Sequence, residues 1–64
     1  MNSSLRSEID SCIRELESIA CGLRETADSI TRCIEGMETD GYVRALRASA
    51  EKYEEAARKL RKIQ

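Results

Sequence analysis

The fold of this chain is decided by residues 5–37, which read LRSEIDSCIRELESIACGLRETADSITRCIEGM. Apolar residues recur there every three or four positions through five heptads, whose positions we label a to g. The a positions are Ile9, Leu16, Leu23, Ile30 and Met37; the d positions are Leu5, Cys12, Ile19, Thr26 and Cys33; and the e positions are Ile13, Ala20, Ala27 and Ile34. A stripe this wide and regular predicts one long helix that packs against other helices.

A break follows at residues 36–41, where Gly36 and Gly41 have the polar residues Thr39 and Asp40 between them. Glycine readily adopts the left-handed backbone that ends a helix, and a short polar side chain caps the start of the next one. We therefore expect a turn at about 36–41 in which both glycines supply left-handed conformations. Asp40 is the expected N-cap of the following helix, with Thr39 as the alternative.

Residues 42–63 form a second, narrower stripe that also predicts a helix. Its apolar and small residues are Val43, Ala50 and Ala57 at a; Leu46, Tyr53 and Leu60 at d; and Tyr42, Ser49, Ala56 and Ile63 at g. Two helices joined by a short turn pack as an antiparallel hairpin. The sequence thus predicts an all-α fold, a single two-helix hairpin over residues 1–64. We expect its helices at about 4–37 and 42–63. Ser3 or Ser4 is the expected cap of the first helix.

The predicted first helix is longer than the second, at roughly 50 Å against roughly 33 Å. Its first turns, residues 5–13, would therefore extend past the end of a lone hairpin. A chain this small also needs a staple or a partner for stability. We expect two hairpins, either a homodimer or a pair of related proteins, to assemble as a four-helix bundle or coiled coil. The predicted oligomer interface comprises Leu5, Ile9, Cys12, Ile13, Leu16, Ile19, Leu23, Ile30, Ile34, Leu46, Tyr53 and Leu60.

The net charge of −1 conceals an asymmetry between the two predicted helices. Residues 1–40 carry four Arg against nine Asp and Glu, whereas residues 41–64 carry seven Lys and Arg against three Glu. Antiparallel helices of opposite sign attract each other weakly, although ordinary solvated helix faces would also explain the pattern. Pairs of opposite charge four residues apart within a helix are Asp10–Arg14, Asp28–Arg32, Glu54–Arg58 and Glu55–Lys59.

Heptad geometry separates the three cysteines. Cys12 and Cys33 occupy d, so we expect them to face the core as small apolar residues. Cys21 occupies f and should point outward, which makes it a candidate intermolecular thiol. Along one helix Cys12 lies roughly 13 Å from Cys21 and roughly 31 Å from Cys33, whereas a disulfide needs Cα atoms within about 7 Å. Any disulfide would therefore join two chains, through Cys21 of each or through Cys12 and Cys33 of an antiparallel pair.

Gly22 lies in the middle of the long stripe. A glycine in a helix interior lowers helix stability by about 1 kcal/mol relative to alanine. Two interpretations are open for its g position: another helix approaches closely there, or the glycine is a tolerated surface residue.

The residue types that carry most enzyme chemistry are missing. The chain has no His and no Cys-x-x-Cys pair, so we expect no metal site and no cofactor. It has no clustered nucleophile and base, so we expect no enzyme activity. No apolar run reaches the length of a membrane span, and the N-terminus is unlike a signal peptide. We expect a soluble protein made in the cytosol, and export without a cleavable signal stays open.

Nucleic-acid binding is the alternative class of function, because the second helix is basic. Its cationic residues are Arg44, Arg47, Lys52, Arg58, Lys59, Arg61 and Lys62. Against this alternative, the whole chain is slightly acidic, and no aromatic platform accompanies the basic residues. We therefore consider nucleic acid a less favoured partner than protein.

A family resemblance points to protein binding. The long first helix, the turn at residues 39–41 and the apolar spacing that follows resemble the small Trp-Xaa-Gly helical hairpins of bacterial type VII secretion and their shorter helper proteins. The residues that carry this spacing are Leu46, Tyr53, Ala56, Ala57 and Leu60, and the resemblance covers roughly residues 5–63. Gly41 stands at the turn glycine of that family, and Thr39 replaces its Trp. Ala57 follows Tyr53 by four residues, so the Tyr-x-x-x-acid export signal is absent.

The resemblance implies a helical-hairpin subunit or helper of a type VII-like secretion complex. Export would then depend on a partner that carries the signal. The layout is also similar in architecture to plasmid copy-number regulators, whose hairpins dimerise into four-helix bundles and bind paired RNA loops. That second likeness implies the alternative of a dimeric nucleic-acid-binding regulator.

Overall fold

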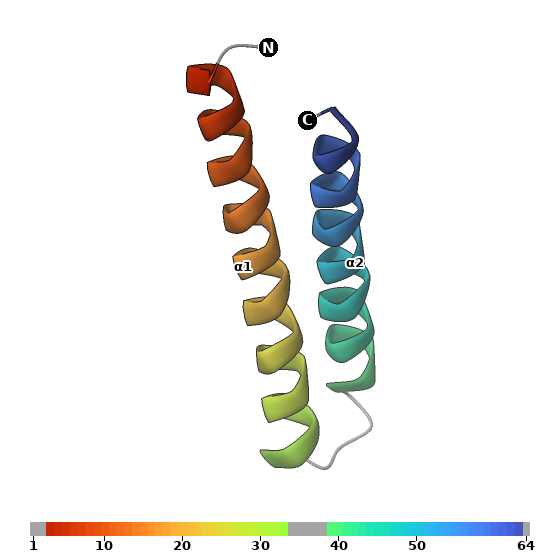
Figure 1. Cartoon of the computed structure of the whole chain (residues 1–64). Coiled ribbons are helices and arrows are strands. Elements are labelled where there is room, and N and C mark those ends of the chain that lie inside the picture. Colours follow the sequence, from red (N-terminus) through yellow and green to blue (C-terminus); the bar gives the residue numbers. More distant parts are fainter. Residues whose placement is uncertain (1–2, 34–38, 64) are drawn as a thin grey trace.

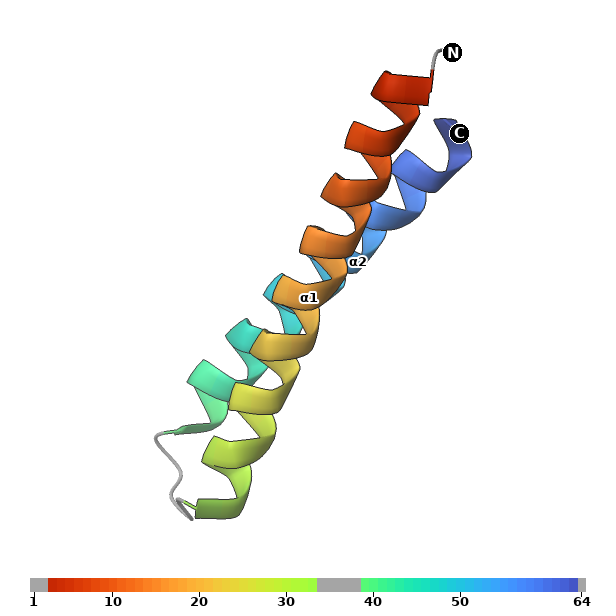
Figure 2. The same ribbon diagram turned by 60° about the vertical axis from the view of Figure 1, so that its left-hand side comes forward.

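The computed structural model describes residues 3–33 and 39–63, and these residues form two helices. Helix α1 covers Ser3–Cys33 and helix α2 covers Asp40–Ile63. The two helices run antiparallel and lie side by side along most of their length (Figure 1, Figure 2). The prediction of an all-α helical hairpin is confirmed.

The hairpin is long and thin, with a radius of gyration of 15.1 Å and dimensions of 51 × 15 × 9 Å. A compact chain of the same length would have a radius of gyration of about 11 Å. Because the described residues form a single layer of two helices, most of each helix surface faces solvent. Neither of these helices combines the length and the apolar character that a membrane span requires.

A narrow seam of small residues holds the two helices together. Its buried side chains are Ile13, Ala20 and Ala27 on α1 and Ala50 and Ala57 on α2. They occupy the e positions of α1 and the a positions of α2, so each helix contributes one buried residue per heptad. Small side chains along a seam let two helix backbones approach closely. The seam also buries little apolar area, because four of its five residues are alanine.

The observed ends of α1 differ from the predicted ones. The helix begins at Ser3, so Ser3 and Ser4 lie in its first turn and neither precedes it as a cap. It is described as far as Cys33. Three residues of the predicted stripe and turn, Ile34, Gly36 and Met37, lie outside the described residues.

Helix α2 starts earlier than predicted. Asp40 is its first helical residue, and Gly41 follows inside the first turn, so the helix includes two residues that we had placed in the turn. The predicted left-handed conformation of Gly41 is wrong, because no described residue has a positive φ. Thr39, the alternative cap, directly precedes the helix. A carboxylate in the first turn suits the partial positive charge of the helix N-terminus.

Gly22 does not mark a close approach of the two helices. A Cβ atom added at this residue would meet nothing within 4 Å. Within the hairpin Gly22 is therefore a surface glycine, which was the second of the two interpretations open from the sequence.

Candidate interaction surface

Two flanks of the hairpin border the buried seam, and the helical repeat assigns residues to each. Each residue advances about 100° around a helix. On α1 the a and d positions therefore lie on one side of the buried e positions, and the b and f positions lie on the other. On α2 the d and g positions lie on one side of the buried a positions, and the e and b positions lie on the other.

Three ion pairs between the helices show which sides meet. They are Arg24–Glu54 at 2.7 Å, Arg47–Asp28 at 3.0 Å and Arg61–Glu17 at 2.6 Å, each measured from nitrogen to oxygen. They join b and f positions of α1 to e positions of α2. We call the surface formed by these six residues the polar flank.

The opposite side of the seam is the apolar flank. It is formed by a and d positions of α1 and by d and g positions of α2. Its residues are Leu5, Ile9, Cys12, Leu16, Ile19, Leu23, Thr26, Ile30 and Cys33 on α1 and Tyr42, Leu46, Ser49, Tyr53, Ala56, Leu60 and Ile63 on α2. The hairpin is therefore polar along one flank and apolar along the other.

The central ion pair of the polar flank is bidentate. The Arg24 guanidinium donates from Nε to Glu54 Oε2 at 3.0 Å and from Nη2 to Glu54 Oε1 at 2.7 Å. This planar fork is the strongest geometry for an arginine–carboxylate pair. The hydrogen bond from Arg24 lowers the pKa of the Glu54 carboxyl, and Glu54 raises the pKa of Arg24 in return.

The ion pairs also fix how the helices are aligned. Glu17 and Arg24 are one heptad apart on α1, and their partners Arg61 and Glu54 are one heptad apart in the reverse direction on α2. The same heptad step on both helices could have indicated these pairs from sequence, because equivalent positions meet repeatedly in an antiparallel pair. We instead expected Glu54 to pair with Arg58 in its own helix.

Two of the other predicted pairs had different outcomes. Asp28 pairs across the hairpin with Arg47 and not with Arg32, since its f position lies at the edge of the polar flank. The predicted pair between Glu55 and Lys59 is present, with nitrogen and oxygen 3.8 Å apart.

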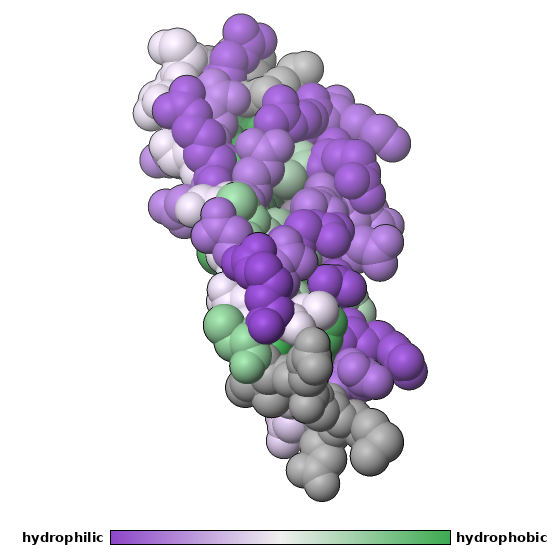
Figure 3. All heavy atoms as spheres, turned by 90° about the horizontal axis from the view of Figure 1, so that it is seen from below, coloured by the Kyte–Doolittle hydropathy of each residue, from purple (hydrophilic) through white to green (hydrophobic). Residues whose placement is uncertain are grey.

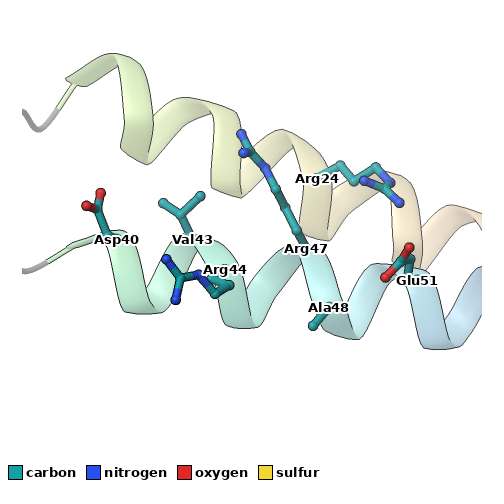
Figure 4. Close-up of a pocket in the computed structure, with 7 residues that line it drawn as sticks. All are labelled: Arg24, Asp40, Val43, Arg44, Arg47, Ala48 and Glu51. Carbon is teal, nitrogen blue, oxygen red and sulfur yellow. The ribbon is translucent and has the colours of Figure 1, made fainter.

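A shallow groove of about 490 Å³ opens on the polar flank near the start of α2. It is lined by Arg24, Asp40, Val43, Arg44, Arg47, Ala48 and Glu51 (Figure 4). The Arg47 side chain extends across it from α2 toward α1 in that view. Two of its three arginines, Arg24 and Arg47, are already ion-paired to carboxylates. No group of three or more metal-ligating side chains occurs among the described residues. The groove therefore offers side chains of both charges.

The apolar flank leaves large side chains in contact with solvent. Leu5 is 45% exposed, Ile19 46% and Tyr53 38%. Tyr42 and Ile63 are each more than half exposed. The half-buried apolar residues of this flank are Ile9, Leu16, Leu23, Ile30, Leu46, Ala56 and Leu60. Viewed from the turn end, the surface shows patches of hydrophobic atoms between hydrophilic ones (Figure 3).

Most residues of the predicted oligomer interface lie on the apolar flank. Ile13 is the exception among the described ones, because it is 4% exposed and packs in the seam. Since α2 reaches Ile13, the uncovered part of α1 is shorter than the predicted overhang of residues 5–13. The first turns of α1 nevertheless extend past the end of α2 (Figure 1). Ile34 lies outside the described residues.

Cys12 and Cys33 are exposed in the hairpin, contrary to the prediction that they face the core. The reason is which row of α1 forms the buried seam. The e positions of α1 are buried against α2, so the d positions lie about 100° away from it, on the apolar flank. Both thiols therefore belong to the surface that the single chain leaves uncovered.

Cys21 is exposed and free, and its outward placement was expected from its f position. Its thiol lies 3.5 Å from Glu25 Oε1 and donates a hydrogen bond to it. That bond, together with the negative charge of the carboxylate, raises the pKa of the thiol. Cys21 is therefore less readily ionised than an isolated cysteine, and the thiolate is the reactive form.

Comparison of this chain with models of protein families, with curated proteins and with solved structures finds no match. No residue role is therefore carried over from a relative. The contrast between the two flanks is the feature from which a function can be argued.

Proposed function

We propose that this chain is a protein–protein interaction module whose apolar flank packs against another helical hairpin to complete a four-helix bundle. The observation that carries the proposal is the exposure of Leu5, Ile19 and Tyr53 along one flank. Contiguous exposed apolar surface is uncommon on a monomer and usually marks an interaction site. The proposed role is binding and involves no catalysis.

The small seam supports the same proposal. A hairpin whose buried residues are Ile13 and four alanines gains little from burial. Small chains with so little core generally require a disulfide, a metal or a partner chain. Packing on the apolar flank would bury the a positions of α1 and the d positions of α2, which hold the larger side chains.

The biological setting that we propose is a type VII-like secretion complex, with this chain as a subunit or helper. The support is the hairpin layout together with the resemblance described above. Because Tyr53 is followed four residues later by Ala57 and not by an acid, export would depend on a partner that carries the signal. The chain would be made in the cytosol and would be exported only in complex with that partner. Release into the medium only from cells with a functional type VII system would support this setting, and release independent of it would contradict it.

The nucleic-acid alternative has less support. Arg47 and Arg61 of the basic helix are engaged by Asp28 and Glu17 of α1, which neutralises part of its charge. Titration with duplex RNA and duplex DNA at low salt separates the two classes of function. Binding that weakens steeply with salt would favour a nucleic-acid regulator, and flat titrations would remove that alternative.

The test of the interaction module compares two charged substitutions. Ile19→Glu places a charge on the apolar flank, and the control Ser18→Glu places the same charge on the exposed outer face one residue away. We expect the helicity of the wild-type chain to rise with its own concentration or on adding a partner hairpin. Ile19→Glu should abolish that gain, and Ser18→Glu should preserve it. Circular dichroism and sedimentation measure both. A fully helical, stable monomer would overturn the proposal.

A further inference from the structure

We infer that the partner on the apolar flank is a second copy of this chain, with α1 of each copy packed against α2 of the other and both turns at the same end. The inference rests on the proposed function, because it specifies what the apolar flank binds. Three features support it: the angle between two rows of each helix, the size of the side chains in those rows, and the charges that border the flank.

The first feature is angular. On α1 each d residue directly precedes an e residue, so the d row lies about 100° from the seam. On α2 each g residue directly precedes an a residue, and the same angle separates these rows. A helix in a square bundle has its two neighbours at right angles. Each helix of this hairpin therefore has a row for its partner in the chain and a second row, at nearly a right angle, for a helix of another chain.

Between these two rows, each helix carries a third row that would face the centre of the bundle. On α1 it is the a row, with Leu16 and Leu23, and on α2 it is the d row, with Leu46 and Leu60. These side chains are half-buried in the hairpin, as expected for residues that a second hairpin would finish covering.

The second feature is side-chain size. The g row of α2 contains Ser49 and Ala56, which are as small as the alanines of the existing seam. The d row of α1 offers Cys12, Ile19 and Thr26 to meet them. A seam between α1 of one copy and α2 of the other would therefore allow a close approach similar to that within the chain.

The third feature is charge, and it selects the partner. The outer margin of the apolar flank on α1 is the g row, with Glu8 and Glu15. The corresponding margin on α2 is the c row, with Lys52 and Lys59. All four residues are exposed. One margin is thus acidic and the other basic, so the flank is complementary to its own copy when α1 meets α2.

The position of these charges along the hairpin sets the direction of packing. The ion pairs place Glu17 level with Arg61 and Arg24 level with Glu54, so Glu15 and Lys59 lie within about four residues, or about 6 Å, of each other along the hairpin axis. Lys52 is level with residues 24–26 of α1, nearer the turn, where the α1 margin carries the uncharged Gly22 and Ser29. When the open ends coincide, Glu15 of one copy therefore lies near Lys59 of the other. In that arrangement all neighbouring helices are antiparallel.

Packing α1 against α1 of the second copy fits less well. A parallel pair would place Glu15 beside Glu15 of the second copy. An antiparallel pair would place Cys12 beside Cys33 of the second copy, and the acidic margin would meet the uncharged one. The three arrangements thus differ in which charges and which thiols come together.

Charge reversal tests the arrangement directly. Glu15→Lys and Lys59→Glu each replace two attractions per dimer by two repulsions, so each variant alone should self-associate about tenfold more weakly at low salt. Because Lys59 also lies 3.8 Å from Glu55 of its own helix, Glu55→Gln controls for the loss of that contact. An equimolar mixture of the two variants restores both attractions and should form heterodimers with wild-type affinity. The control Ser18→Lys should associate like the wild type.

Sedimentation and native mass spectrometry of the mixed variants, one of them isotope-labelled, provide the readout. The differences between variants should shrink in about 0.5 M salt, because exposed charges are screened there. Oxidation by diamide, which accepts the two hydrogens that a pair of thiols loses, should give no Cys12–Cys33 disulfide between copies.

Three results would overturn the inference. Variants that associate like the wild type, with no preference for heterodimers, would reject the charge pairing while leaving the flank proposal intact if Ile19→Glu still dissociates the assembly. A Cys12–Cys33 disulfide between copies would show that α1 of one copy packs against α1 of the other, and not against α2. A wild-type chain that stays monomeric but gains helicity with a different hairpin would reject the second copy and support the interaction module.

Discussion

The two flanks of the hairpin border one seam, yet they differ in whether their side chains find partners within the chain. On the polar flank, Glu17, Arg24 and Asp28 of α1 find partners on α2 within the same chain. On the apolar flank, Leu5 and Ile19 remain nearly half exposed. Ion pairs at a surface add little stability, but they favour one alignment of the two helices over others. Burial of apolar side chains adds more stability and does not by itself favour one alignment. The polar flank thus aligns the hairpin, and the apolar flank holds the surface area that could stabilise it.

The largest expected effect comes from Leu23→Asp, which tests whether the apolar flank supplies stability. Leu23 is half-buried at an a position between the seam and the exposed d row. A carboxylate there loses apolar burial and resists desolvation, at about 2–3 kcal/mol. We expect loss of both association and helicity, measured by sedimentation and circular dichroism. Cys21→Ser, on the other side of α1, should change neither in reducing buffer. Dissociation by Cys21→Ser would show that the flanks are assigned wrongly.

Gly22→Ala has the next largest expected effect and examines the margin of the apolar flank. The added Cβ meets nothing within 4 Å in the hairpin, so helix propensity should dominate and stabilise the chain by about 1 kcal/mol. Thermal unfolding at several protein concentrations measures it. Gly41→Ala, also in open space but in the first turn of α2, should give a smaller gain. A lower affinity between chains after Gly22→Ala would instead reveal a close approach of a second chain at this margin.

A smaller effect is expected on the polar flank, where the Arg24–Glu54 pair should make the stability of the chain depend on pH. The pKa of Glu54 is lowered in the folded chain from its ordinary value of 4.5, chiefly by the hydrogen bond from Arg24. Its contribution to stability is therefore complete above the unfolded pKa and is lost as the pH falls through the folded pKa. Glu54→Gln should reduce the difference between unfolding midpoints at pH 7 and pH 3. Glu55→Gln, one residue away, should leave that difference nearly unchanged. If both variants change that difference equally, the Arg24–Glu54 pair does not contribute specifically to the pH dependence of stability.

The smallest expected effect concerns Cys21 and leaves stability untouched. Glu25 raises the pKa of this thiol, so Glu25→Gln should increase its thiolate fraction at pH 8 and speed its alkylation by iodoacetamide. The rate is measured by mass spectrometry of the Cys21 peptide. The control Glu15→Gln removes a carboxylate elsewhere on α1 and should leave the Cys21 rate unchanged. An unchanged rate in Glu25→Gln would mean that the thiol is not held by Glu25 in solution.

The helices and their antiparallel pairing could be predicted from the sequence, because heptad periodicity reports directly on which residues share a helix face. Which row of α1 forms the seam could not be predicted from periodicity alone, since the stripe is three rows wide. The size of the side chains decides it. Ala20 and Ala27 occupy the e row and match Ala50 and Ala57 on α2, so the backbones approach most closely along those rows. Cys12 and Cys33 are exposed in the single chain for that reason.

The surface was predicted less completely than the fold. The apolar residues of the candidate interface were identified because they are the same residues that define the stripe. The ion pairs across the hairpin were missed, because Arg24 and Glu54 run against the overall charges of their helices and because their pairing depends on the seam. The conformation of Gly41 was missed because a glycine beside a turn is compatible with a helical first turn as well as a left-handed one.

The placement of two cysteines has a practical consequence. Cys12 lies on the apolar flank and Cys21 lies toward the polar side of the same helix, and both are free and exposed in the single chain. Any partner that covers the apolar flank will shield the first thiol and spare the second. The ratio of labelling at these two native positions therefore measures the occupied fraction of the chain, in a crude extract and without an attached tag.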